Sequence, residues 1–339
     1  LAMQAVRDLG VPLKHNARLL LGTDEESGSS DIEYYYGKEP YAPCTFSPDG
    51  EFPVINIEKG SYKPVFTKTW EAETATPRVK ELHGGFRINV LPPEAECVIA
   101  GLSAQAAQSC CDQAAAHTGA SFELREEGDD LRILCHGTGA HASTPEEGNN
   151  AITALLHLLT LLPLAKVGST AALRALAVLF PHGDSAGKAL GIAQADEISG
   201  PLTLAFSLLE VTPTGLSGQF DSRVPICADE ANCKAAAEAA FAKFGFTASG
   251  EMEAPHHTPA DTPFVSTLLK CYEQFTGQKG ECLAIGGGTY VHHIPGGVAF
   301  GCAMPGFNGN MHGADEHTCI ADQLTAAKIF TQAIIDLCG

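Results

Sequence analysis

The sequence predicts an α/β protein built from two parts, and three observations lead to this fold class. Apolar segments typical of strands alternate with segments of helical spacing along the 339-residue chain. From about residue 68 the pattern changes to short strands and Ala-rich helices. The order strand, helix, strand, His, Pro, helix occurs there twice, starting near Phe86 and near Gly218. We therefore expect two related α+β units to form an inserted domain, 68–257, between the segments 1–67 and 258–339.

The first segment shows a helix, a strand and two polar turns. Helical spacing predicts a helix over 1–9, which Gly10 would end. An apolar strand at 17–21 leads into the acidic turn 24–27, and Asp49 follows a short apolar strand in a Pro-Asp-Gly turn. No initiator Met, cap or strand precedes Leu1, so we expect the first strands of this part to be missing.

The inserted segment repeats one series of elements. Its first copy predicts a strand at 86–92, a helix at 104–116 and a strand at 131–136. A long buried helix follows, with Thr144 as N-cap, Pro145 as first helical residue and Glu147 as capping-box partner. The second copy predicts a strand at 218–225, a helix at 232–244 and a strand at 247–252.

The last segment returns to alternating strands and helices. A helix is predicted over 262–275, capped by Asp261. A strand at 282–285 opens into the glycine turn 286–288, a further strand covers 298–301, and a closing helix covers 321–337.

Composition excludes several classes of function. The formal charge of −19, from 40 acidic and 21 basic residues, argues against nucleic-acid and anionic-membrane partners, which need a basic face. No apolar run approaches the roughly 20 residues that span a bilayer. The twelve cysteines form no C-x-x-C pair, so we expect reduced thiols and a cytoplasmic protein rather than disulfides or a zinc ribbon.

The most informative motif is the run of three carboxylates Asp24, Glu25 and Glu26 at a predicted strand end. Three neighbouring negative charges repel one another unless they are well solvated or share a cation. Two adjacent glutamates can also divide the work, because one can bind a metal while the other moves a proton. The alternative is an ordinary solvated acidic turn.

Other candidate residues also have ordinary interpretations. His141 is as well explained by a hydrogen-bonded histidine beside a helix start, and His312 by a surface residue in a Gly-flanked loop. Asn89 and Arg223 would be ordinary strand residues, and Asp49 an ordinary turn residue. We interpret five further histidines as structural or exposed, namely His256, His257, His292, His293 and His317.

Four motifs together resemble a known family. They are G-T-D-E-E-S-G at 22–28, S-P-D-G-E-F-P-V at 47–54 with E-K-G at 58–60, G-A-H-A-S-T-P at 139–145, and G-G-G-T-Y at 286–290 followed by M-H-G-A-D-E at 311–316. In this order they resemble the dinuclear-zinc exopeptidases related to aminoacylase and carnosinase, most of all the bacterial monomeric broad-specificity dipeptidases with an enlarged lid. The resemblance covers essentially the whole chain.

The resemblance implies a role for each motif. Segments 1–67 and 258–339 would form a zinc-exopeptidase-like catalytic domain, a mixed sheet flanked by helices, and 68–257 its inserted lid of two related units. Glu25 would be the general base of a site with two zinc ions, and His141 would stabilise the oxyanion. The metal ligands would be Glu26, Asp49 and His312. The substrate, a small peptide, would be bound by Asn89, Arg223, Gly287 and Gly288.

The chain departs from the family pattern in two places. Two further ligands, a His in an H-x-D strand end and a bridging Asp, have no counterpart before the first helix. The one H-x-D present, His182-Gly183-Asp184, lies inside the predicted lid and is not assigned to the site. His292 also stands where relatives often have Arg after G-G-G-T-Y. We therefore expect this chain to bind less zinc than a complete enzyme and to be inactive itself.

The sequence thus predicts a monomeric, metal-dependent dipeptidase. A deacylase of N-acyl amino acids is the first alternative, although an enlarged lid of two units argues against it. A catalytically silent fragment or binding module is the second, and the missing ligands favour it.

Overall fold

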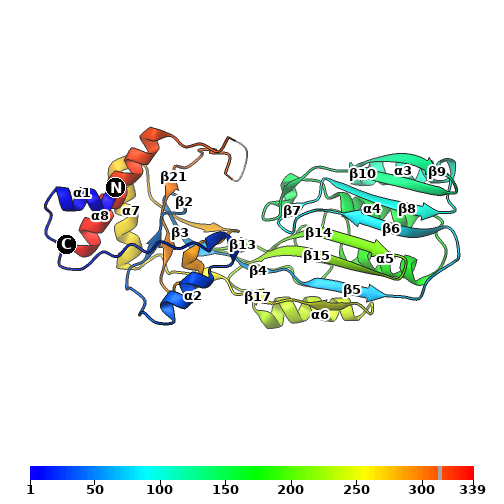
Figure 1. Ribbon diagram of the computed structural model, residues 1–339, viewed down its shortest axis with the longest axis horizontal. Helices are drawn as coiled ribbons and strands as arrows, with labels where there is room; N and C mark the ends of the chain where they lie inside the picture. Colours follow the sequence, from blue (N-terminus) through cyan, green and yellow to red (C-terminus); the bar gives the residue numbers. More distant parts are fainter. Residues whose placement is uncertain (312–314) are drawn as a thin grey trace. The chain divides into compact units, whose positions relative to one another are not determined.

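The structure, a computed structural model, describes residues 1–311 and 315–339 and divides the chain into two compact units. Unit 1 joins Leu1–Lys59 to Pro255–Gly339, and unit 2 is Gly60–Ala254 (Figure 1). The boundaries predicted from the sequence, at 68 and 258, lie a few residues further along the chain. Helices and strands occur in both units, so the predicted mixed α/β class is confirmed.

Unit 1 is built around the strand β3, Val54–Glu58, whose five residues are all buried. β3 pairs with three strands, in parallel with β19 (Cys282–Ile285) and antiparallel with β18 (His256–His257) and β20 (Val298–Ala299). β1 (Phe46–Ser47) adds to β20, and β2 (Gly50–Glu51) pairs in parallel with β21 (Cys302–Ala303). The helices of the unit are α1 (Ala2–Asp8), η1 (Glu25–Ser27), α2 (Ser30–Tyr36), α7 (Pro263–Thr276), η4 (Tyr290–His293) and α8 (Ile320–Cys338).

The core of unit 1 forms where α7 and α8 pack together and against this sheet. Phe52 and Phe300 are completely buried and meet edge to face, with ring centroids 5.0 Å apart. Burying large aromatic side chains is the main favourable term in such a small sheet.

Unit 2 contains one large sheet with helices on one face. The strand order is β16-β5-β15-β14-β6-β8-β10-β9, with β4 also paired to β15 and β17 to β4. These strands are β4 (Gly60–Tyr62), β5 (Val65–Thr69), β6 (Arg78–Gly84), β8 (Glu94–Ala100), β9 (Ser121–Glu127), β10 (Asp130–His136), β14 (Thr203–Thr212), β15 (Gly215–Val224), β16 (Thr247–Ser249) and β17 (Met252–Glu253). The pairs along the whole order are antiparallel.

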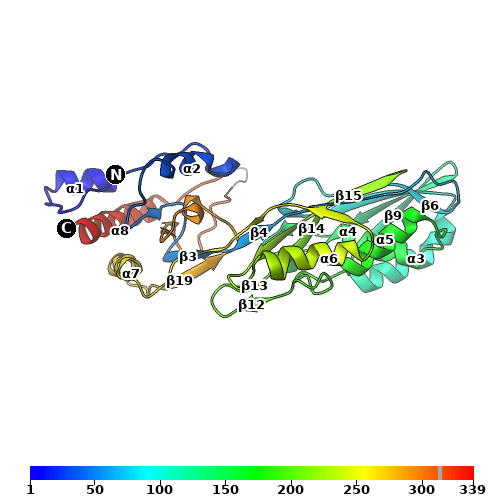
Figure 2. The ribbon, with the colours of Figure 1, turned by 90° about the horizontal axis from the view of Figure 1, so that it is seen from below.

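The helices of unit 2 cover one face of this sheet (Figure 2). They are α3 (Ala104–Thr118), α4 (Ala151–Leu161), α5 (Gly168–Leu179), α6 (Ala235–Ala242) and the short segments η2 (Pro145–Glu147) and η3 (Glu230–Lys234). Small two-stranded ladders join β7 (Val90–Leu91) to β11 (Ala140–His141) and β12 (Ala195–Asp196) to β13 (Gly200–Pro201). Alternation along β10 places Leu131, Ile133 and Cys135 under the helices and the half-buried Arg132 on the opposite face.

The strand predicted at 17–21 is wrong. The segment has no strand conformation, and Leu19 and Leu21 are 63% and 85% exposed. A strand needs a hydrogen-bonding neighbour, and within 1–311 and 315–339 no strand pairs with this segment.

The predicted starts of two helices are also corrected. Thr144 makes no cap hydrogen bond, because Asn149 pairs in an extended conformation with Thr138 and interrupts the helix. The long helix α4 begins at Ala151, where the Asn150 side chain accepts a hydrogen bond from the Thr153 N–H. Similarly, Thr262 rather than Asp261 caps α7, and its side chain accepts from the Val265 N–H.

The second copy of the sequence repeat crosses the boundary between the units. Its strand β15, helix α6 and strand β16 lie in unit 2, whereas His257 and the final helix α7 lie in unit 1. Within 1–311 and 315–339, no helix combines the length and apolar character that a bilayer span requires.

Asn150→Ala should lower the free energy of unfolding of unit 2 by about 1–2 kcal/mol. The change removes both the cap to Thr153 and the bond from Asn150 Nδ2 to the Phe206 carbonyl, 2.8 Å long. Thr144→Ala, the matched control, should cost much less. Trp70 is the one tryptophan of the chain and lies in unit 2, so denaturation followed by its fluorescence measures this unit. Equal losses in both variants would contradict the assigned cap.

Candidate functional site

The acidic motif forms a short 3-10 turn in unit 1. Glu25 and Glu26 occupy its first positions, with Glu25 half-buried and Glu26 exposed. The turn ends at Gly28, whose φ of 118° is a conformation that few other residues adopt. Asp24 links both ends, because its carbonyl accepts from the Ser29 N–H at 2.8 Å. Its carboxylate also accepts from the N–H of Ser30, the first residue of α2, at 2.9 Å.

A tyrosine from a distant part of the chain contacts this turn. The Tyr290 hydroxyl donates to Asp31 Oδ2 at 2.9 Å and accepts from the Asp24 N–H at 3.2 Å. The same Asp31 oxygen accepts from the Thr23 N–H at 2.7 Å. This Thr23 bond is the largest cause that lowers the pKa of Asp31, and the Tyr290 hydroxyl acts in the same direction. The turn is therefore held by a charged acceptor and a hydroxyl.

The other expected metal ligands are less well gathered. Asp49 is exposed and lies in the break between β1 and β2, while His312 lies outside the described residues. Among residues 1–311 and 315–339, no three His, Cys, Asp or Glu side chains lie close enough together to hold a metal ion. Zinc prefers about four donors. The carboxylates of Glu26 and Asp49 are suitable donor types, but the described residues do not complete a zinc site.

The glycine turn is attached to a buried carboxylate. Glu58 ends β3 with a fully buried side chain, and it accepts hydrogen bonds from the Thr289 N–H at 3.1 Å and hydroxyl at 2.8 Å. His292 Nδ1 lies 3.2 Å from the same carboxylate. A buried carboxylate is costly unless it is hydrogen-bonded, and here Thr289 and His292 surround it. Gly287 faces open space, whereas a Cβ on Gly288 would lie 3.6 Å from Glu58 Oε2.

Two predicted site residues of unit 2 lie side by side. The β7–β11 ladder pairs Val90 with His141, and the Asn89 carbonyl accepts from the Ala142 N–H at 3.0 Å. His141 is exposed, and its Nδ1 accepts from the Ser143 N–H at 3.2 Å. Because Nδ1 is an acceptor, the neutral ring carries its proton on Nε2. His141 is thus oriented as a hydrogen-bond donor.

Arg223 is fixed by a buried aspartate on its own strand. Nε and Nη2 donate to the two oxygens of Asp221 at 2.8 and 2.9 Å, a two-pronged pair. The Asp221 side chain is fully buried and that of Arg223 is 11% exposed. Because the pair orients the guanidinium group, it favours a binding role, but a purely structural ion pair would have the same geometry.

The H-x-D sequence of unit 2 has structural partners. His182 Nδ1 lies 2.9 Å from the Thr153 hydroxyl, and Nε2 lies 3.1 Å from the Thr118 carbonyl. Asp184 accepts from the N–H groups of Ala186, Lys188 and Ala189 and so stabilises its own turn. Both side chains are engaged within unit 2, so they are poor replacements for the two ligands that the family pattern lacks.

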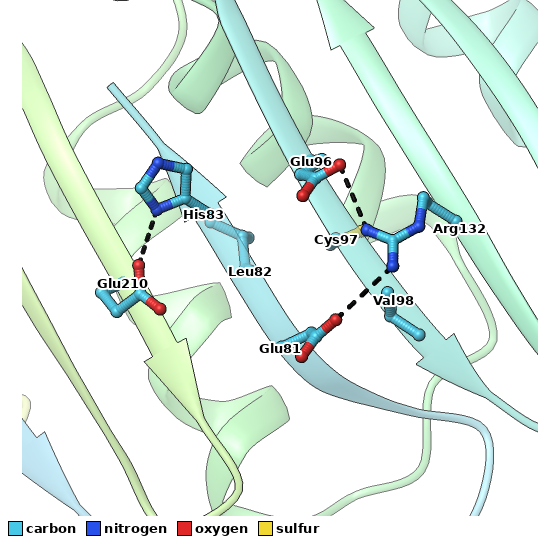
Figure 3. A pocket seen from close by; sticks show the side chains of 8 residues that line it. All are labelled: Glu81, Leu82, His83, Glu96, Cys97, Val98, Arg132 and Glu210. Atoms are coloured by element: carbon cyan, nitrogen blue, oxygen red, sulfur yellow. Dashed lines mark hydrogen bonds and ion pairs between the residues drawn. The ribbon is translucent and has the colours of Figure 1, made fainter. Parts of the chain in front are cut away.

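A polar recess on the open face of the large sheet is a charge ladder rather than a catalytic centre (Figure 3). His83 of β6 lies 2.7 Å from Glu210 of β14. Arg132 of β10 lies between Glu96, at 3.2 Å, and Glu81, at 3.8 Å. Cross-strand pairs of opposite charge are typical of a solvated sheet face.

Sequence reasoning noted the E-K-G and T-Y motifs but assigned no role to Glu58, Tyr290 or Asp31. The signal for Tyr290 is its position in the T-Y pair that follows the glycine turn. Nothing in the local sequence identified Asp31 as its partner, because the two residues are 259 positions apart. The structure brings Glu25 and Glu26 together in unit 1, and Asn89 and His141 together in unit 2.

A comparison with protein families identifies the class. The model of Peptidase family M20/M25/M40 matches residues 1–336, so the chain belongs to this family, which is metal-dependent. The resemblance inferred from the four motifs is thereby confirmed at the level of the family.

Similar individual proteins agree with this assignment. The chain is 34% identical to YtjP of Bacillus subtilis (strain 168) over 99% of its own length and 72% of that protein. It is 31% identical to a protein named Beta-Ala-Xaa dipeptidase from Lactobacillus delbrueckii subsp. lactis, over 99% and 71%. The crystal structure of the aminopeptidase PepT from Bacillus cereus ATCC 10987 shares the fold, with a TM-score of 0.50 and 14% identity over 99% of this chain and 68% of that one.

Unit 2 should lose stability as the pH falls below about 6.5, because burial lowers the pKa of His182. A lowered folded-state pKa gives a stabilisation that is present above the unfolded pKa and lost as the pH falls through the folded one. His182→Gln should reduce this pH dependence between pH 7.5 and 5, because the Gln amide does not titrate in this range. The amide can still donate a hydrogen bond to the Thr118 carbonyl, so the fold is kept. Trp70 fluorescence during urea unfolding at several pH values measures the effect. Equal pH slopes in both proteins would refute it.

Proposed function

We propose that the chain provides the greater part of a metal-dependent dipeptidase that releases the C-terminal residue of its substrate. The observation that carries this proposal is the match over 99% of the chain to a protein named as a dipeptidase. In this proposal unit 1 is the catalytic domain, with a mixed sheet flanked by helices. Unit 2 is the lid, in which β8, α3 and β9 with β10 form one half-unit and β15, α6 and β16 the other.

Glu25 is the proton acceptor in this proposal. Glu25 is half-buried at the start of the 3-10 turn, and the hydrogen bonds of Asp24 hold the backbone of this turn. Glu25 would take a proton from the attacking water and pass it to the leaving amine. The neighbouring Glu26 is exposed and would serve as a metal ligand.

Zinc is the metal we propose, with Glu26, Asp49 and His312 as ligands contributed by this chain. When bound, zinc makes a water molecule nucleophilic near neutral pH. We expect this chain alone to hold less than stoichiometric zinc, because these three donors are fewer than the roughly four that each zinc ion prefers. Metal analysis by mass spectrometry tests this, and two fully occupied zinc ions per chain would overturn it.

Unit 2 and the glycine turn supply the substrate contacts in this proposal. The Nε2–H of His141 would donate to the carbonyl oxygen as negative charge develops on it. Asn89, on the same ladder, would hold the polar groups of the peptide. Arg223 would bind the substrate carboxylate, for which the fork of its guanidinium group is well shaped. The backbone at Gly287 and Gly288 would approach the peptide, since neither residue has a side chain.

A deacylase of N-acyl amino acids is the second candidate, because the same family fold and acidic turn would serve both reactions. A panel of β-Ala-Xaa dipeptides, α-dipeptides and N-acetyl amino acids separates the two. The proposal expects hydrolysis of dipeptides and little of N-acetyl amino acids. The reverse order would establish the deacylase, and no turnover of any would favour a catalytically silent chain.

In a form of the protein that carries the complete set of metal ligands, Glu25→Ala should lower kcat for the best dipeptide by about 10²–10⁴-fold, because it removes the proposed base. Metal content should stay near that of the parent protein. Glu26→Ala, the matched control one residue away, should instead lower metal content. Steady-state kinetics and metal analysis of both variants decide the assignment, and the opposite pattern would exchange the two roles.

We also propose that the protein is a monomer, because the outer surfaces of unit 2 are poorly suited to pairing. The edge strand β9 carries Glu123, Arg125, Glu126 and Glu127, and charged edge strands resist strand addition. The open face of the sheet holds the charge ladder around Arg132.

Light scattering at neutral pH should therefore give the mass of one chain, 35.5 kDa, independent of protein concentration. A stable dimer that crosslinks through the edge strand β9 would contradict this expectation.

A further inference from the structure

We propose that Tyr290 is a positioning residue that fixes the turn carrying Glu25. The inference rests on the proposed function only where it concerns catalysis, because the contacts themselves are independent of it. Tyr290 begins η4, one residue beyond the glycine turn, and its hydroxyl acts as donor and acceptor at once. Its acceptor Asp31 belongs to α2, so one hydroxyl joins three segments of unit 1.

The geometry around the hydroxyl leaves little freedom. Backbone N–H groups of consecutive residues, Thr23 and Asp24, point at Asp31 and Tyr290 respectively. A Cβ added to Gly22 would lie 2.0 Å from Tyr290 Oη and 2.6 Å from Asp31 Oδ2. Only glycine permits so close an approach. The segment Gly22–Asp24 therefore curves around the hydroxyl immediately before the turn begins.

The far end of the turn is also tied. Asp24 accepts hydrogen bonds from Ser29 through its carbonyl and from Ser30 through its carboxylate. Holding Asp24 thus holds both ends of the segment that contains Glu25. A displacement of about 1 Å at a reacting group can cost about 10²-fold in rate. The Tyr290 hydroxyl controls the position of the base without touching the substrate.

Three variants test this inference. Tyr290→Phe removes only the hydroxyl, and Gly22→Ala displaces it by a steric route that leaves Tyr290 intact. Tyr272→Phe is the matched control, because Tyr272 is a buried tyrosine of unit 1 whose hydroxyl donates to Gln278 at 2.8 Å, away from the turn. Each protein is compared by amide hydrogen exchange of peptides covering 22–30 and, in a form that carries the complete set of metal ligands, by dipeptide kinetics.

Tyr290→Phe and Gly22→Ala should both accelerate exchange at Thr23 and Asp24 and lower kcat about 10- to 100-fold, with KM changed less than about twofold. The double variant should be little worse than either single one, because both break the same contact. Tyr272→Phe should leave exchange in this peptide and kcat unchanged, even where it lowers the thermal midpoint.

The outcomes separate this inference from the proposed function. Unchanged exchange at 22–30 in Tyr290→Phe overturns the inference whatever the activity. Faster exchange with unchanged kcat, while Glu25→Ala is inactive, also overturns it, because the turn then need not be fixed for catalysis. Full activity of Glu25→Ala refutes the role of Glu25 instead, and exchange alone then decides whether Tyr290 holds the turn.

Discussion

The buried carboxylate of Glu58 is the constraint on which the arrangement of unit 1 depends. It ends the central strand β3 with no exposure to water, so its oxygens require partners from elsewhere in the chain. Thr289 and His292 supply them, and this requirement brings the segment after the glycine turn to the end of β3. Tyr290 lies between these two residues and is thereby placed next to the acidic turn. The need to give the buried Glu58 carboxylate hydrogen-bond partners thus brings together segments that are distant in the sequence.

In unit 2, by contrast, the polar groups have partners on the same strand or on the neighbouring strand of a two-stranded ladder. Asp221 and Arg223 are two residues apart on β15, so the pleat places both on the same face. His141 pairs with Val90, the neighbour of Asn89, because β7 and β11 are adjacent strands. Such contacts depend on local register rather than on segments from far along the chain. The residues proposed to bind substrate are therefore set by the sheet itself.

The sequence predicted elements whose pattern is local, and failed where a distant partner decides. The helices α3 and α8 and the strands β10 and β19 follow from periodicity. Thr144 had every local mark of a cap, yet the pairing of Thr138 with Asn149 comes first, so the long helix is capped by Asn150 and begins at Ala151. At the site, the resemblance to the family suggested roles for Glu25, Glu26, His141 and Arg223, and these roles stay predictions. Tyr290 could not be assigned from the sequence because its partners are more than 250 positions away.

The connections between the units have a further consequence. The chain leaves unit 1 at the end of β3 and returns at β18, and these two strands are hydrogen-bonded neighbours. Inside unit 2, the first strand β4 and the last strand β17 are likewise paired. Each unit therefore has its two cut ends at adjacent points, and closing such a gap costs little chain entropy. In evolutionary terms, the 60–254 segment is an insertion between two neighbouring strands of unit 1. It can be enlarged, exchanged or lost through a short hairpin, while the strands on either side keep their partners.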